Sequence, residues 1–346
     1  MKLLLSCGPG LENKNNSHII VVDWKSKEII DQHESFHQVL SSSHKGFTGG
    51  HIYDKNLVVA NEVEIFIYEL APLKLLFRTT NRLFNDLHYV TQIDSKFYIC
   101  NTGLDTIEVF DKDFKHLQTI PLIKQFGFKF FHLCRLFSDN FKRWRNKKLN
   151  KLGYYDHLQD NIWGKNIRKL VNPLCFHNSQ RDLRFHDLRP HLLHPNYLFK
   201  YNGDIWVTLW RGGGVMSLNN GRFLVKESGW PKDALHDGVL DKSTFFLTDA
   251  QNNRLLIYKQ AKDSIEFQPI HRIDITDARE EGFLRGLCVT TKSIFLGLSA
   301  RRNSYKWPFA RVLEYDRESL QKVDEWIIPE KYGKMIYSVL DVQKYY

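Results

Sequence analysis

The sequence predicts an all-β fold, a six-bladed β-propeller, and three observations carry this prediction. A polar turn followed by an apolar, β-branched or aromatic run recurs at a spacing of about 40 residues. A third strand-like segment follows each copy and a fourth usually follows that, as in a four-stranded propeller blade. The two ends of the chain supply the pieces of one further blade. A β-sandwich followed by other modules would not produce this period.

Each copy of the repeat predicts a hairpin that enters a buried strand. The five copies span residues 54–61, 94–101, 202–208, 243–249 and 292–297, and the third strands are expected at 64–70, 106–111, 214–219, 254–259 and 311–316.

The sixth blade is predicted to be split between the two ends of the chain. Residues 3–7, 19–23 and 28–32 read as its second to fourth strands. Residues 336–342 form a lone strand-like segment that resembles the start of the segment at 87–91. If this last strand docks innermost beside 3–7, it closes the ring and hides two sheet edges. We therefore expect a single domain over residues 1–346.

Residues 122–190 interrupt the period and are predicted to be a basic, partly helical insertion between two blades. Within 126–151, apolar residues recur at spacings of three and four, which favours an amphipathic helix. The insertion holds 15 basic and five acidic residues, an excess that equals the whole net charge of +10. Basic and acidic residues therefore balance in the rest of the chain.

Composition limits the class of protein. Hydrophobic residues make up 42% and charged residues 25%, as in soluble globular proteins. No apolar run approaches the ~18–20 residues of a transmembrane helix, and the three leucines after Lys2 are too short for a signal peptide. The five cysteines include no Cys-x-x-Cys pair, so a disulfide framework or zinc ribbon is not expected. These features predict a cytoplasmic protein.

The candidate site comes from aligning the innermost strands, which line the central channel of a propeller. Polar residues begin these otherwise apolar strands, and burying them without partners would be costly, so we expect them to face a wet channel mouth. Catalytic roles are predicted for His88, His236, Arg285 and Tyr337, and substrate contacts for Thr48, Asn196 and Arg301.

Three histidines from different strands are the sharpest feature of this ring. His88, His194 and His236 could hold a divalent metal such as Zn²⁺ or Fe²⁺ with one coordination position open. A metal-free pocket and a purely structural role remain open alternatives, and His51 is a weaker candidate. Arg285 could clamp a carboxylate or phosphate. The strand-end residues Asn61, Asn101 and Asp249 are more simply explained by bonds to the adjoining turns.

The C-terminal half resembles an uncharacterised bacterial family of six-bladed propellers, within the NHL and gluconolactonase-like superfamily. The segment 248–258 is similar to an NHL blade, and 282–287, 297–301, His194 with Asn196, and His236 match the bacterial family. The resemblance covers roughly 190–315 and implies the fold and the position of a site, but no reaction. The sequence departs from the family at His236, where Leu-His-Asp replaces Pro-His-Ser, and in the basic insertion.

Two functions from different classes follow. The first is a protein that acts on a small anionic molecule at the axial pocket, either as an enzyme, with a metal-dependent hydrolase or lyase as the candidate class, or as a binding protein. The alternative is a non-catalytic scaffold that captures a protein partner or an anionic surface through residues 124–186. Nucleic acid is a less favoured partner, because the blade repeat offers no element that reads a groove.

Overall fold

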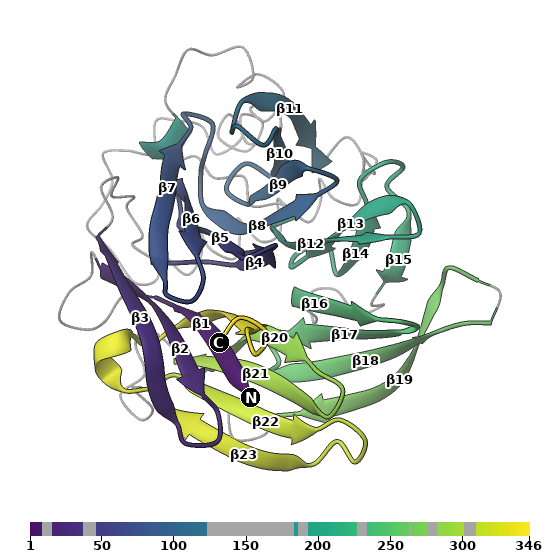
Figure 1. The fold of residues 1–346 in the computed structure, drawn as a ribbon. Coiled ribbons are helices and arrows are strands. Elements are labelled where there is room, and N and C mark those ends of the chain that lie inside the picture. Colours follow the sequence, from purple (N-terminus) through teal and green to yellow (C-terminus); the bar gives the residue numbers. More distant parts are fainter. Residues whose placement is uncertain are drawn as a thin grey trace, which may run out of the picture.

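The structure, a computed structural model, describes residues 1–8, 16–36, 46–122, 183–185, 193–226, 234–262, 264–275, 282–300 and 309–346. Six four-stranded antiparallel sheets are arranged around a central axis (Figure 1). The six-bladed propeller predicted from the repeat is therefore confirmed. We name the sheets blades A to F in the order in which the chain enters them.

Within each blade the strands follow one another in chain order from the innermost to the outermost strand, except in blade A, which takes its innermost strand from the C-terminus. Blade A consists of β24 (Ile336–Asp341), β1 (Lys2–Cys7), β2 (Asn16–Asp23) and β3 (Glu28–Phe36); blade B of β4 (Gly50–Tyr53), β5 (Asn56–Ala60), β6 (Glu64–Glu69) and β7 (Lys74–Thr80); blade C of β8 (Leu87–Ile93), β9 (Lys96–Asn101), β10 (Thr106–Phe110) and β11 (His116–Pro121).

The other three blades follow the basic insertion. Blade D consists of β12 (Pro195–Tyr201), β13 (Asp204–Leu209), β14 (Gly214–Ser217) and β15 (Phe223–Lys226); blade E of β16 (Leu235–Asp241), β17 (Thr244–Asp249), β18 (Arg254–Gln260) and β19 (Phe267–Asp274); blade F of β20 (Gly282–Val289), β21 (Ser293–Ala300), β22 (Arg311–Asp316) and β23 (Lys322–Ile327).

The repeated polar turns are tight hairpins between the first and second strands. Two residues join β8 to β9 and β12 to β13, and in both loops the two central residues have positive φ. Such turns match the right-handed twist of the flanking strands and favour Asp, Asn and Gly. The loop between β8 and β9 consists of Asp94 and Ser95, and the loop between β12 and β13 consists of Asn202 and Gly203. This turn chemistry explains why the motif repeats along the sequence.

The core consists of apolar layers between neighbouring blades. Successive side chains of β1 point to opposite faces, so Leu3 and Leu5 pack with Phe295 of blade F, whereas Leu4 packs with Phe66 of blade B. Corresponding clusters join blades B and C, C and D, D and E, and E and F. Each blade is therefore buried on both faces, which explains the near-continuous apolar character of the second strands.

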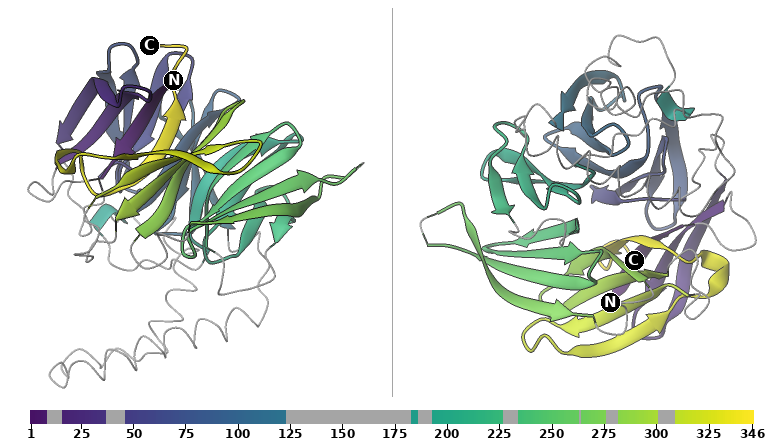
Figure 2. Two further views of the ribbon diagram at one scale, coloured as in Figure 1. Left: turned by 90° about the horizontal axis from the view of Figure 1, so that it is seen from below. Right: turned by 180° about the vertical axis from the view of Figure 1, so that it is seen from behind.

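The closure predicted for the two termini is confirmed. β24 pairs antiparallel with β1, with Leu4 opposite Leu340 and Leu5 opposite Val339. Blade A is also bonded to its neighbour, because Trp24 Nε1 donates a 2.5 Å hydrogen bond to Glu314 of blade F. The views in Figure 2 place both termini at one face of the wheel, where the innermost strands end. We call this face the second mouth of the channel, and the face where these strands begin the first mouth.

Asp105 holds both ends of the basic insertion. Its carbonyl accepts a bond from Leu122 N (3.1 Å), and its Oδ1 accepts from Leu193 N (3.0 Å) and His194 N (2.7 Å). Within the insertion, the short 3₁₀ helix η2 (Leu183–Phe185) is also anchored, because Leu183 N donates to Arg82 O. The helix predicted at 126–151 lies outside the described residues.

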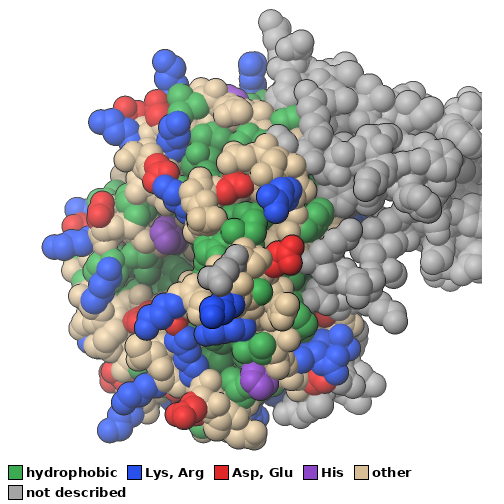
Figure 3. All heavy atoms as spheres, turned by 90° about the vertical axis from the view of Figure 1, so that its right-hand side faces the viewer, with side chains coloured by type: hydrophobic (Ala, Val, Ile, Leu, Met, Phe, Trp, Pro, Cys, Tyr) green, Lys and Arg blue, Asp and Glu red, His purple; other side chains and the backbone are tan. Residues whose placement is uncertain are grey.

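The described surface is mixed in charge. On the side drawn in Figure 3, Lys and Arg are interspersed with Asp and Glu, in keeping with the charge balance outside residues 122–190. Cys7, Cys100 and Cys288 are buried free thiols. No helix in the described ranges has the length and hydropathy needed to span a membrane.

Candidate functional site

Five of the predicted ring residues lie in β-bulges of the innermost strands at the first mouth. In β8, Leu87 and Tyr89 face consecutive residues of β9, which leaves His88 as an extra residue. A bulge of this kind bends the strand and re-aims the side chain. Four other innermost strands carry a bulge at the same level. The bulge residues are His88 in β8, Asn196 in β12, His236 and Asp237 in β16, Arg285 and Gly286 in β20, and Tyr337 in β24.

Blade B contributes no polar side chain to this ring. Thr48 is paired, because its N–H and its hydroxyl both donate to Ala60 O (2.7 and 3.1 Å). The residue at the level of the other bulges is Gly49, where a Cβ would lie 2.5 Å from Cδ2 of Tyr89 and 2.7 Å from His88 O. The structure thus gives Thr48 a structural role, and the predicted substrate contact is not part of our proposal.

Hydroxyl groups near the ends of the second strands hold the first mouth together. Each donates to a backbone carbonyl at the start of the innermost strand of the next blade. These hydroxyl groups were not among the predicted site residues, although a Ser or Thr recurs near the ends of the second strands. The bonds join Ser6 to Thr48 O (3.0 Å), Thr102 to Pro195 O (2.5 Å), Thr208 to His236 O (2.6 Å) and Ser299 to Ile336 O (2.9 Å).

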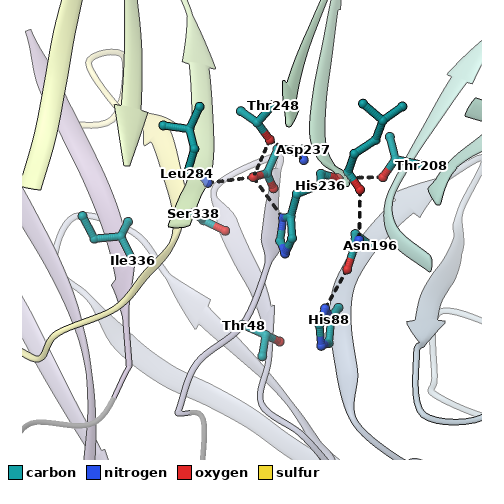
Figure 4. A network of polar contacts seen from close by, with 12 residues as sticks. Thr48, His88, Asn196, Thr208, His236, Asp237, Thr248, Leu284, Ile336 and Ser338 are labelled. Carbon is teal, nitrogen blue, oxygen red and sulfur yellow. Dashed lines mark hydrogen bonds and ion pairs between the residues drawn. The ribbon is translucent and has the colours of Figure 1, made fainter. Parts of the chain in front are cut away.

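Asn196 fixes the protonation of His88 (Figure 4). Asn196 Nδ2 donates to Leu235 O (3.1 Å), and its Oδ1 lies 2.7 Å from His88 Nδ1. A carbonyl only accepts, so the amide nitrogen must face Leu235 and the amide oxygen must face the imidazole. His88 Nδ1 therefore carries a proton. On the other side of the ring, His88 Nε2 is 3.5 Å from Asp86 Oδ1, an ion pair when the ring is protonated.

Asp237 links the bulges of blades E and F. Its Oδ2 accepts a 2.7 Å bond from Gly286 N, and it also lies 3.1 Å from His236 Nδ1 and 3.4 Å from Thr248 Oγ1. Gly286 has a φ of +75°, a conformation that glycine adopts without strain. Asp237 therefore shapes the backbone beside Arg285.

Two of the histidines and Arg285 lie around the indole of Trp210, a residue that was not predicted for the site. The ring of Trp210, which follows β13, lies 5.3 Å from His194 and 6.0 Å from His236 between ring centroids, and 5.8 Å from Arg285 Cζ. His88 is 4.8 Å from His194 and 6.0 Å from His236. The three histidines and the guanidinium, drawn from blades C to F, thus form one contiguous group.

Arg285 is a buried cation surrounded by aromatic rings. The residue is 9% exposed, and its Cζ lies 4.9 Å from the Tyr337 ring and 5.7 Å from the Phe283 ring. Its Nε is buried and has no hydrogen-bond acceptor among the described residues. Arg311 is buried to a similar degree, yet its guanidinium donates a 2.8 Å bond to Glu325. Arg285 is therefore the guanidinium of the two that is poised to meet an external anion.

The three-histidine metal hypothesis gains no support from the geometry. One nitrogen of His88 already faces Asn196, and one nitrogen of His236 faces Asp237. Within the described ranges, no group of three or more His, Cys, Asp or Glu side chains is placed to hold a metal ion. The metal site stays a prediction, and we derive no chemistry from it.

Two further predictions have different outcomes. Arg301, a predicted substrate contact, lies outside the described residues. The structural explanation of the strand-end residues is confirmed: Asn61 Oδ1 accepts from Glu64 N (2.6 Å), Asn101 Oδ1 from Asn85 N (2.8 Å), and Asp249 Oδ1 from Ala234 N (3.0 Å). These side chains tie down loops at the first mouth.

Solved structures share this fold at low identity. A protein of unknown function from Bacteroides caccae has a TM-score of 0.58 and 11% identity, covering 98% of this chain and 97% of that chain. A protein from Lactobacillus plantarum has a TM-score of 0.52 and 9% identity, and a chain of a nidogen–laminin complex has 0.52 and 12%, each covering 98% of both chains.

These likenesses confirm the predicted resemblance to uncharacterised bacterial propellers at the level of the fold. Neither a family model nor a curated protein matches the sequence.

Proposed function

We propose that this protein binds a small anionic molecule at the first mouth of its axial channel, with Arg285 as the principal anchor. The observation that carries the proposal is the buried guanidinium with aromatic neighbours and no acceptor for Nε among the described residues. A guanidinium offers parallel N–H donors that match carboxylate and phosphate oxygens. An anion placed there would both satisfy Nε and neutralise the buried charge.

The neighbouring groups suit an anion with an apolar or planar part. Trp210 and Phe283 border the guanidinium and offer ring surface to such a part. His88 donates its Nδ1 proton to Asn196 and faces Asp86 through Nε2, so these contacts hold the imidazole in place at the same mouth. The catalytic roles of His88, His236, Arg285 and Tyr337 stay predictions, because anion binding is the part of the function that the geometry supports.

Titration calorimetry with acetate, inorganic phosphate and phenyl phosphate tests the proposal. We expect saturable binding of at least one of these anions, with phenyl phosphate favoured over inorganic phosphate if the aromatic rings contribute. Arg285→Gln should lower the affinity at least tenfold, whereas Arg222→Gln, a change at an exposed arginine, should leave it unchanged. Equal binding by all three proteins, or no binding of any anion, would refute an anion site at Arg285.

A further inference from the structure

A cavity lies on the axis beyond the Arg285 site, toward the second mouth. Its volume is about 180 Å³, below the roughly 300–1,000 Å³ of pockets for drug-sized ligands. All six innermost strands contribute to its wall. It is lined by Gly50, His51, Tyr89, Tyr197, Asp237, Val239, Gly286, Leu287, Cys288, Val289, Tyr337, Ser338, Val339, Leu340 and Asp341.

Two carboxylate side chains line this cavity. Asp237 is 6% exposed, and its recorded hydrogen bonds all end at Oδ2, so no described residue donates to its Oδ1. Asp341 adds a second carboxylate at the second mouth. Burial lowers the pKa of His51, so this imidazole is neutral at pH 7. The lining contains no Lys or Arg. Asp237, a largely buried side chain, thus offers its second carboxylate oxygen to a cation.

The rest of the lining is aromatic and aliphatic. The rings of Tyr89 and Tyr197 lie 4.5 Å apart between centroids. Burial raises the pKa of Tyr197 to about 12 and that of Tyr89 well above its ordinary value, so both phenols are neutral. Val239, Leu287 and other aliphatic side chains complete the wall. Inorganic Ca²⁺ or Mg²⁺ needs six or more oxygen ligands, whereas aromatic rings with one carboxylate suit an organic ammonium.

We propose that this cavity binds a small methylated ammonium compound, with its positive charge toward Asp237 Oδ1 and its methyl groups against the tyrosine rings and aliphatic walls. The site is separate from the anion site, although the two are neighbours. Tyr337 contacts both, since its ring lies 4.9 Å from Arg285 Cζ and it also lines the cavity. The channel then carries an anion-binding site at one mouth and a cation-binding site toward the other.

Titration calorimetry with tetramethylammonium chloride tests this inference, with potassium chloride at equal ionic strength as the control. Wild-type protein should bind tetramethylammonium saturably and potassium should give no saturable signal. Asp237→Asn should weaken binding at least tenfold, because it removes the charge while one amide oxygen can still accept from Gly286 N. The matched control is Asp316→Asn, which changes an exposed turn carboxylate far from the axis and should bind as wild type.

A second variant keeps the test decisive if Asp237→Asn does not fold. Val239→Phe fills the cavity without touching the carboxylate, and it should also weaken tetramethylammonium binding at least tenfold. Arg285→Met should retain the ammonium affinity, so failure of the anion site and failure of this site can be told apart. The inference is overturned if wild-type protein does not bind tetramethylammonium, if potassium binds equally well, or if Val239→Phe binds as wild type.

Discussion

Replacing Arg285 by methionine tests whether its buried charge serves a ligand or the fold. Removing one partner of a buried ion pair costs about 3–5 kcal/mol, because the other charge is left uncompensated. Arg78 is such a partner, since its guanidinium donates two 2.8 Å bonds to the buried Glu64 carboxylate. Arg78→Met should therefore lower the free energy of unfolding by about 3 kcal/mol or more.

Arg285→Met should behave differently in the absence of ligand. It loses contacts with three aromatic rings, each worth about 0.5–1 kcal/mol, but it also removes a charge that has been taken out of water. These effects offset each other, so the free energy of unfolding should stay within about 1 kcal/mol of wild type. Chemical denaturation followed by tryptophan fluorescence measures both variants. A loss at Arg285 as large as that at Arg78 would refute the reasoning.

The same pair of variants reports ligand binding. An anion at 100 times its Kd stabilises wild-type protein by about 2.7 kcal/mol. With an unfolding entropy of about 2.1 cal/mol/K per residue, a chain of 346 residues should gain about 4 °C in Tm. Arg285→Met should show no such gain, whereas Arg78→Met should show all of it from its lower starting point. An equal gain in Arg285→Met would place the anion elsewhere.

Three further predictions concern the bulges. Gly286→Ala forces a side chain to a φ of +75° and places a Cβ 3.0 Å from a side-chain atom of β24. It should cost about 1–2 kcal/mol in stability and lower anion affinity by displacing Arg285. Unchanged calorimetric affinity would contradict this. Asn196→Leu should lower the free energy of unfolding by about 1–3 kcal/mol, because it leaves His88 Nδ1 and Leu235 O without their partner. In wild type, the ¹⁵N shifts of His88 should show a protonated Nδ1. A ring protonated at Nε2 alone would contradict the assignment. Thr208→Val should cost about 1 kcal/mol in urea denaturation by leaving a bulge carbonyl without its donor, and no loss would show that this bond is not needed.

The fold could be predicted because the repeat unit is local. The two-residue turns and the apolar second strands lie within a few positions of each other, so their period shows which blades exist. The closure by β24 was also predictable, since the strand at 336–342 had no partner nearby in the sequence and β1 lacked an inner neighbour. The helix predicted at 126–151 has no counterpart among the described residues, so the sequence pattern alone supports it.

The site was predictable only in part. Polar residues at the start of apolar strands marked His88, His236 and Arg285 correctly as neighbours at one mouth. Thr48 is bonded to Ala60 O, and the residue of blade B at the level of the bulges is Gly49, so this blade adds no polar side chain to the ring. Trp210 was not predicted because it follows a second strand, and the prediction considered only the innermost strands. The three-dimensional arrangement brings the end of this second strand next to the ring residues.

A crystal structure of the protein grown with a bromine-substituted carboxylate, such as 4-bromobenzoate, tests the central claim most directly. The account predicts carboxylate density within hydrogen-bond distance of Arg285 Nε and an anomalous bromine peak beside Trp210 or Phe283. A carboxylate of this chain on the Arg285 guanidinium, with no ligand density at the first mouth, would contradict it.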